Sequence, residues 1–229
     1  MKGYKVRYFE KLDSTNKKAI SYPVGSVIVA KEQSGGKGRF RRKWCSSRGG
    51  IYMSIVTDAY SPNYLTLIAA IAVNRSIEDA CGIKTMIKWP NDLLFKKKKI
   101  SGILTVISQG KAVVGIGINT NNALPGSLYG KAGSLQQFTG SKIDNRLIIN
   151  NIISCLDHHI GWLKDKRYDK ILSEWKNRSF IGHKIIVKTL KKTVKGTAYD
   201  IDEDCFLIVK DNKGKKERII EGDITIVYP

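Results

Sequence analysis

The sequence predicts an α+β fold of mixed strands and helices, followed by a small β-barrel. Short β-rich segments alternate with segments whose apolar residues recur at helical spacing, which is typical of an α+β layer fold. After residue 181 the pattern changes to short strands separated by turns, which predicts the barrel. We therefore expect two domains, at residues 1–181 and 182–229.

The first sixty residues predict three strands, one short helix and a loop. Apolar and β-branched residues mark the strands, and Asp13 or Ser14 is a suitable N-cap for a helix over "DSTNKKAISY". The expected strands are residues 5–12, 25–32 and 51–56. Three glycines in "QSGGKGRFRRKW", residues 33–44, predict a loop between the second and third strands.

The remaining elements follow from periodicity. Apolar residues predict a helix over 62–81 and two more near 149–163 and 168–177, with a long loop over 121–134. Between these helices we expect a meander of four strands, at 85–89, 93–95, 100–108 and 112–120, with "KKKK" (96–99) at one tip. The expected barrel strands are 183–189, 193–201, 205–211, 216–222 and 224–229.

Composition indicates a globular protein with many cations. The 229 residues carry forty Lys+Arg against twenty Asp+Glu, a formal charge of +20 that would suit nucleic acid, anionic lipid or an acidic protein partner. There is no apolar run of about 18 residues and no signal-peptide pattern, so we expect a cytoplasmic protein without membrane association. The four cysteines and three histidines do not fall at metal-ligand spacing.

Several common catalytic motifs are missing. No Gly-Lys pair is followed by Ser or Thr, so there is no Walker A sequence, and "GIGINTN" (115–121) lacks the third glycine of a dinucleotide fingerprint. There is no G-x-S-x-G sequence and no Cys/His nucleophile pair. An enzyme of this sequence would be expected to form no covalent enzyme intermediate.

Four other stretches, read together, resemble the biotin protein ligases. They are "DSTN" (13–16), "QSGGKGRFRRKW" (33–44), "KWPND" (88–92) and "KKISGIL" (98–104), with "GIGINTN" as a fifth. "KWPND" is the most specific, because packing alone rarely requires Trp-Pro followed by Asn-Asp. The resemblance runs over the whole chain apart from variable loops, and it is to the short form of the family, without an N-terminal DNA-binding repressor domain.

The resemblance implies a class II aminoacyl-tRNA-synthetase-like catalytic domain with a C-terminal SH3-like barrel. It also implies an ATP-dependent reaction that forms biotinyl-5'-AMP, with Mg²⁺, and passes biotin to a lysine of a biotin carboxyl carrier protein or domain of a biotin-dependent carboxylase. We expect no specific DNA contact, no operon repression and, by analogy with relatives, a homodimer.

For the phosphates and the adenylate, the resemblance assigns residues by motif. The catalytic residues are Lys99, Arg39 and Asp92, and Asp92 is also the expected Mg²⁺ ligand. Lys99 is selected over its neighbours by its place three residues before Gly102. The expected ATP and adenylate contacts are Arg39, Arg42, Trp44, Asn91, Lys99 and Asn119.

For biotin, the resemblance points to hydroxyls and amides, which complement the two N–H donors and one carbonyl of a ureido ring. The expected biotin contacts are Ser14, Thr15, Asn16, Gln33, Gly36, Lys37, Gly38, Arg39, Lys99 and Gly102. Trp44, Ile103 and Leu104 are candidates for the apolar walls, although core packing explains each of them equally well.

The sequence departs from the family pattern at three places. Lys37 stands where Arg is more common and loses the bidentate fork. Val106 stands where many relatives have Glu, and the adenine-stacking aromatic has no clear counterpart besides Tyr129. Two alternatives remain open: a lipoate or octanoate ligase of the same superfamily, and a basic nucleic-acid-binding protein.

Overall fold

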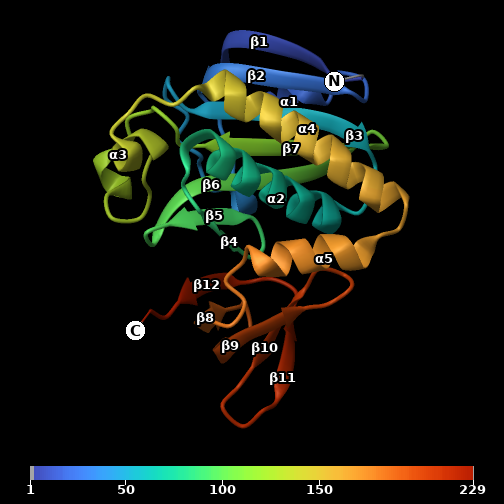
Figure 1. Ribbon diagram of the computed structural model, residues 1–229, viewed down its shortest axis with the longest axis vertical. Helices are drawn as coiled ribbons and strands as arrows, with labels where there is room; N and C mark the ends of the chain where they lie inside the picture. The colour runs from blue at the N-terminus through green and yellow to red at the C-terminus, as the bar shows by residue number, and fades with distance from the viewer. Residues whose placement is uncertain (1–2, 229) are drawn as a thin grey trace.

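The computed structural model describes residues 3–228 and contains two β-sheets (Figure 1). The larger is a seven-stranded mixed sheet in the order β1-β2-β3-β7-β6-β5-β4. Its strands are β1 (Lys5–Leu12), β2 (Ser26–Gln33), β3 (Ile51–Asp58), β4 (Met86–Lys88), β5 (Asp92–Phe95), β6 (Lys98–Ser108) and β7 (Lys111–Ile118). This sheet carries the elements that form the candidate site.

The pairing within this sheet follows the connections. Strands β1 and β2 run parallel, since the short helix α1 (Thr15–Ala19) crosses between them. Strands β4 to β7 form the predicted antiparallel meander, and β7 also pairs antiparallel with β3. Strand β5 covers only the first part of β6, from Lys98 to Gly102.

Two long helices cover one face of the sheet. Helices α2 (Pro62–Cys81) and α4 (Asn145–Lys164) lie across it, and α5 (Tyr168–Asn177) lies between it and the C-terminal strands (Figure 1). Helix α2 buries residues all around its circumference because α4, the sheet and α5 surround it. The apolar core extends without interruption from this layer into the C-terminal sheet.

The opposite face of the sheet is covered by α1 at one end. Ser14 caps this helix by accepting a hydrogen bond from the Lys17 amide, at 3.4 Å. Ala19 packs there in a small second cluster with Ile28 and Val113. Side chains alternate along a strand, so Gly115 and Gly117 lie on this same face farther along β7, with Gly115 against Asn16 of α1.

The C-terminal strands form a five-stranded antiparallel sheet in the order β11-β10-β9-β8-β12. Its strands are β8 (Lys184–Lys188), β9 (Thr193–Ile201), β10 (Leu207–Lys210), β11 (Lys216–Ile219) and β12 (Asp223–Ile226). Trp89, in the "KWPND" stretch, donates its indole N–H to the carbonyl of Cys205 at 2.9 Å. The turn between β9 and β10 is thereby hydrogen-bonded directly to the "KWPND" turn that follows β4.

The structure confirms the predicted α+β fold with its C-terminal β-sheet. Helix α3 (Leu135–Thr139) and two single turns, Arg39–Arg41 and Gly126–Leu128, were not predicted, because segments this short have no measurable apolar period. The last predicted strand includes Pro229, which lies outside the described residues. Among the described helices, none combines the length and apolar character needed to span a bilayer.

Candidate active site

A cavity of about 690 Å³ opens on the sheet face that α1 leaves uncovered. Its walls come from α1, the 33–44 loop, the "KWPND" turn, β6, β7 and the start of β12. The predicted site residues that line it are Ser14, Thr15, Asn16, Gln33, Lys37, Gly38, Arg39, Arg42, Trp44, Asn91, Asp92, Lys99, Gly102 and Asn119. One structural feature thus brings together residues that are spread over more than a hundred positions of the sequence.

Three glycines form the floor of this cavity. Gly102 of β6 pairs with Gly117 of β7, and Gly115 lies two residues earlier on the same face. A Cβ at Gly117 would lie 2.5 Å from the Trp44 indole, and one at Gly115 would collide with the Asn16 amide. The floor has no side chain of its own, and this leaves room for the side chains of Asn16 and Trp44 to lie directly on it.

A cluster of hydroxyls and amides lies beside this floor. The backbone N–H and hydroxyl of Thr15 donate to Gln33 Oε1 at 2.8 and 3.1 Å. The Ser54 hydroxyl lies 2.8 Å from Thr15 Oγ1 and 2.6 Å from Asn16 Oδ1. Ser54 has one hydrogen for these two acceptors, so one acceptor remains available to a ligand N–H.

Gly36 is placed differently from the other predicted contacts. It is buried and is not part of the cavity lining. A Cβ there would lie 2.7 Å from both Ser46 Oγ and the Trp44 carbonyl, and Ser46 Oγ accepts a hydrogen bond from Gln33 Nε2 at 2.9 Å. Gly36 thus allows the loop to pack closely and keeps Gln33 in place.

Lys99 and Asp92 form an ion pair at the cavity. Lys99 Nζ lies 2.6 Å from Asp92 Oδ1, and both side chains are largely buried. The two residues come from adjacent strands, β6 and β5, of one hairpin. Within residues 3–228, the buried Asp92 Oδ1 has this ion pair and no well-aligned hydrogen bond.

The backbone of Lys99 is held by the segment that follows β7. Its N–H donates to the carbonyl of Lys131 at 2.9 Å, and its carbonyl accepts from Gly133 at 3.1 Å. On the other side of β6, Asn91 and Ile103 exchange two hydrogen bonds, one through the Asn91 side chain. These contacts orient the "KWPND" turn and fix where Lys99 and Asp92 meet.

The 33–44 loop adds a half-buried guanidinium. Arg39 lies at the cavity, with its guanidinium carbon 4.9 Å from the centre of the Phe40 ring. Burial lowers the pKa of Arg39, and the nearby Asp92 and Asp223 carboxylates partly offset this effect. Phe40 and Arg41 have positive φ, 53° and 58°, so the backbone reverses sharply after Arg39.

Arg42, a predicted adenylate contact, is bound to the C-terminal sheet. Its Nη1 and Nη2 donate to the two oxygens of Asp223 at 3.0 and 2.5 Å. This bidentate bond raises the pKa of Arg42 and lowers that of Asp223. Arg42 lines the cavity, but in this structure both of its terminal guanidinium nitrogens bind Asp223 and so hold the loop against β12.

Trp44 lies over the glycine floor, where its ring is 5.3 Å from Lys99 Nζ. A Cβ at Gly102 would lie 3.1 Å from the Trp44 ring, so the indole packs directly on the backbone of β6. The indole N–H is buried and has no hydrogen-bond acceptor within residues 3–228. A hydrogen-bond acceptor on a bound ligand could therefore pair with this N–H.

The cavity is strongly cationic. Its lining contains eight Lys and Arg side chains and three carboxylates, and each carboxylate is already paired with one of the cations. The lining cations that form no ion pair within residues 3–228 are Lys37, Arg39, Lys43, Lys88 and Lys131. A site with this excess of positive charge is suited to anionic ligands.

Sequence reasoning missed Lys88, Lys131 and Asp223. Lys88 is half-buried opposite Asp92 in the β4–β5 ladder, and burial lowers its pKa. Lys88 could have been recognised from the sequence, because a lysine directly before Trp-Pro in a buried strand is unusual. Lys131 and Asp223 had no such signal, since only the folded chain brings the 121–134 loop and β12 to the cavity.

The region expected to receive adenine contains aliphatic groups. Tyr129 is 88% exposed and does not line the cavity, whereas Leu124 and Leu128 do. The side chain of Val106, at the position where many relatives have Glu, also faces the cavity. The structure therefore does not bring Tyr129 to the site.

Asp92 is the residue that could hold a divalent metal. Among residues 3–228 there is no cluster of three or more His, Cys, Asp or Glu that would form a protein-only metal cage. Mg²⁺ commonly uses one or two carboxylates together with waters and substrate phosphates. The buried Oδ1 of Asp92, which accepts no hydrogen bond, fits that mode of binding.

Two family models match the chain. The "Biotin/lipoate A/B protein ligase family" matches residues 8–121, and the "Biotin protein ligase C terminal domain" matches residues 180–227. The first match contains the glycine-rich loop, the "KWPND" turn and the β6–β7 floor. The second match corresponds to the five-stranded sheet.

Individual proteins agree with these matches. The bifunctional ligase/repressor BirA of Bacillus subtilis is 36% identical over 98% of this chain and 74% of that protein. The biotin–[acetyl-CoA-carboxylase] ligase of Mycobacterium tuberculosis is 29% identical over 87% of this chain and 78% of that protein. The solved biotin protein ligase of Aquifex aeolicus, in complex with biotin and ATP, superimposes with a TM-score of 0.89 at 25% identity, covering 98% of this chain and 99% of that one.

Proposed function

The chain belongs to the biotin/lipoate A/B protein ligase family, and we infer that it is an ATP-dependent biotin protein ligase. It activates biotin as biotinyl-5'-AMP, with release of pyrophosphate, and transfers biotin to a lysine of a biotin carboxyl carrier domain. The comparisons give no sign of the lipoate ligase or the nucleic-acid-binding alternative.

One observation carries this assignment most directly. A single cavity has an anion-binding part, with Lys99, Arg39 and Lys88, and a hydrogen-bonding part, with Thr15 and Gln33. The first part suits a carboxylate and a phosphate, and the second suits a polar heterocycle such as the ureido ring. Biotin and ATP need both kinds of surface in one site.

In the first half-reaction, we propose that Lys99 brings two anions together. A carboxylate and an α-phosphate at about 4 Å repel by roughly 4 kcal/mol at an effective dielectric of 20. The Lys99 ammonium, largely buried and held in place by its backbone hydrogen bonds, offsets this repulsion. Arg39 would hold the phosphate oxygens from the loop side and retain the adenylate after pyrophosphate leaves.

For Mg²⁺, we propose that Asp92 is the protein ligand and that Asn91 supports it from the same turn. Bound there, the metal would neutralise charge on the triphosphate. Asp92 already faces Lys99 at 2.6 Å, so binding of nucleotide and metal would replace the ammonium beside Asp92 by the doubly charged metal ion. Lys99 would then be free to turn toward the carboxylate of biotin.

For biotin, we propose that the ureido ring binds the cluster around Thr15, Asn16 and Gln33. The single Ser54 hydroxyl hydrogen can be donated to Thr15 Oγ1 or to Asn16 Oδ1, and the other oxygen can accept a hydrogen bond from a ureido N–H. The glycine floor lets Trp44 lie close to the backbone of β6 and β7, where its indole can form one wall for the flat bicycle. Predicted contacts Ser14, Lys37, Gly38 and Gly102 complete the set that lines the cavity.

In the second half-reaction, the carrier lysine must attack as a neutral amine. Unpaired cations around the cavity favour the neutral form of any amine that enters, because like charges disfavour the charged form. The site therefore needs no dedicated general base to prepare its nucleophile. The lysine nitrogen attacks the acyl carbon, AMP leaves with the electrons of the bond between the acyl carbon and the phosphate oxygen, and the nitrogen loses one proton to solvent as the amide forms.

Several further statements remain predictions. We propose that residues 1–181 and 182–229 are two domains, which the separate family matches support. A cytoplasmic location, a homodimer and the absence of specific DNA contacts also stay as predicted from the sequence. The relatives named for acetyl-CoA carboxylase support a carboxylase carrier domain as the acceptor.

The test of this function is a comparison of two acids. The chain is incubated with ATP, Mg²⁺ and either biotin or lipoate, and pyrophosphate release is measured. We expect release with biotin and little with lipoate. Release with lipoate but none with biotin would show that the chain is a lipoate ligase instead.

A further inference from the structure

The hairpin between β5 and β6 has lysine at both positions of its two-residue turn. Phe95 and Lys98 are the last paired residues, so Lys96 and Lys97 form the turn between them. Their φ angles are 47° and 67°. A turn with two positive φ values strongly favours Asn-Gly, and a lysine there is strained. The chain thus keeps lysines where local structure disfavours them.

Each lysine of this tip lies against an aromatic ring. Lys96 Nζ is 5.6 Å from the centre of the Phe95 ring, Lys97 Nζ is 4.4 Å from that of Tyr228, and Lys98 Nζ is 5.8 Å from that of Tyr129. Within residues 3–228, no carboxylate pairs with any of the three. We name these residues, Lys96, Lys97 and Lys98, the tip lysines. They are ordered cations without an anionic partner.

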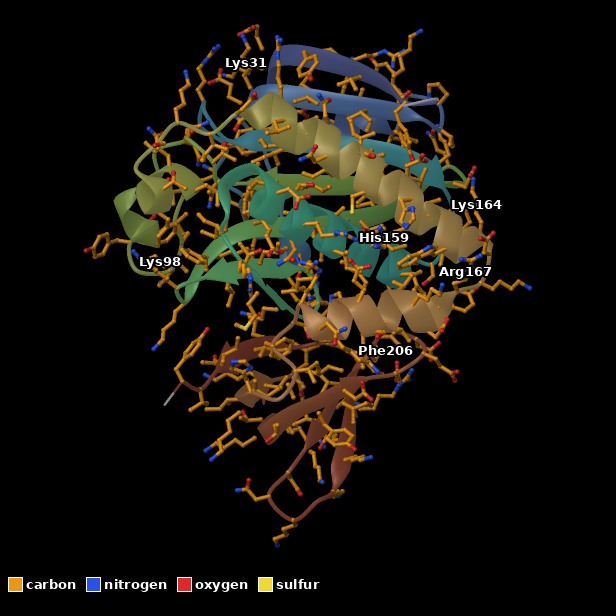
Figure 2. The ribbon with its side chains drawn as sticks, in the orientation of Figure 1. Lys31, Lys98, His159, Lys164, Arg167 and Phe206 are labelled. Carbon is orange, nitrogen blue, oxygen red and sulfur yellow. The ribbon has the colours of Figure 1, made fainter. Side chains whose placement is uncertain are left out.

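The tip lysines lie next to the reaction site along β6. Lys98 directly precedes Lys99, and a strand rises about 3.3 Å per residue, so the turn lies within about 10 Å of Lys99. They do not line the cavity themselves. Figure 2 shows Lys98 at the edge of the molecule, well away from Phe206 in the turn between β9 and β10. A folded protein that brings a lysine to Lys99 would come close to the tip lysines, because they lie within about 10 Å of Lys99.

We propose that the tip lysines form a docking surface for an acidic face of the biotin carrier domain. The inference rests on the proposed function, which requires a folded protein to approach Lys99. A carrier with Asp or Glu near its target lysine would be attracted by the tip, whereas a basic carrier would be repelled by the tip and the cavity together. Nucleic acid is the competing occupant, but it has no need to reach Lys99.

The test compares two charge reversals that change net charge equally. The first variant is Lys96→Glu/Lys97→Glu, and the control is Lys213→Glu/Lys215→Glu in the exposed β10–β11 turn, far from the cavity (Figure 1). Pyrophosphate release with biotin and ATP is measured without carrier. Transfer is then measured against the concentration of an apo carrier domain of net negative charge, at low and high salt.

We expect both variants to release pyrophosphate like the wild type. The tip variant should raise the KM for the carrier about tenfold and flatten its dependence on salt, while the control should not. A further variant, Lys96→Asn/Lys97→Gly, removes both charges and supplies the residues that the turn favours. It should keep or raise the melting temperature and still raise the KM for the carrier, which separates charge from folding.

Two results would overturn the inference. One is an equal KM for the carrier in the tip variant and the control. The other is an unchanged KM together with loss of retention of a duplex oligonucleotide, which would make the tip a nucleic-acid contact. Failure of the wild type to release pyrophosphate with biotin would instead contradict the proposed function, so the two failures are distinguishable.

Discussion

Arg42 and Asp223, 181 residues apart in the chain, join the glycine-rich loop to the first residue of β12 through two parallel hydrogen bonds. The C-terminal sheet therefore contributes to the site in two ways. It supplies part of the cavity lining, and it holds the loop that carries Arg39. A residue outside the predicted catalytic domain becomes a positioning residue for the reaction.

Asp223→Asn should loosen the glycine-rich loop. Both partners are more than half exposed, so we expect a cost of only about 1 kcal/mol, or about fivefold faster loss of the adenylate. Adenylate dissociation and tryptic cleavage within the loop measure the effect. Asp204→Asn, which weakens a similarly exposed pair with Arg218, is the matched control and should change neither.

The same pair should be sensitive to acid. The hydrogen bond from Arg42 lowers the pKa of Asp223 below its usual 3.8, so the pair contributes stability above that pH and loses it as pH falls through the lowered value. The difference in free energy of unfolding between wild type and Asp223→Asn should be present at neutral pH and vanish in stronger acid. A difference that grows on acidification would contradict this ion pair.

Lys99→Ala should abolish adenylate formation without unfolding the protein. Loss of one preorganised charge at the reacting atoms costs about 10²–10³ in rate. The ion pair with Asp92 is lost as well, but the backbone hydrogen bonds of residue 99 remain. Pyrophosphate release and circular dichroism test this, with Lys142→Ala, an exposed lysine, as the control.

Arg39→Gly should release the adenylate into solution. Loss of charge-assisted hydrogen bonds worth about 1.5–3 kcal/mol would speed its escape about ten- to a hundredfold. The escaped adenylate would label lysines of bystander proteins, which is detected with a streptavidin blot. Arg41→Gly is the control, because it removes a charge from the same turn but Arg41 does not line the cavity. We expect this variant to keep its selectivity for the carrier lysine.

Gly117→Ala should close part of the cavity. Its Cβ would lie 2.5 Å from the Trp44 ring, so the indole must move, at a cost of about 1–3 kcal/mol. We expect weaker biotin binding by calorimetry and a lower melting temperature. Gly161→Ala, in α4 with open space around it, should instead raise stability by about 0.5–1 kcal/mol.

Local periodicity predicted most of the fold. Helices 62–81 and 168–177 were predicted to the residue, because each has a repeating apolar face and a clear boundary. The strand order was not predictable in the same way. The position of β3 beside β7 depends on contacts between segments about sixty residues apart.

The site was predictable where a motif carries chemistry in consecutive residues. "KWPND" and the strand around Lys99 pointed to residues that lie together at the cavity. Asp223 was not predictable, because nothing near it in sequence distinguishes it from other carboxylates of short strands. Residue type alone did not identify the adenine contact, because Tyr129, the aromatic residue in the expected loop, faces solvent.

The bare floor of the cavity also determines how the substrate range can be changed. At Gly102, Gly115 and Gly117 there is no side chain to shorten, and any side chain added would collide with Trp44, Asn16 or Lys99. Laboratory evolution toward bulkier carboxylic acids must therefore act on the walls, at positions such as Ile20 and Val106.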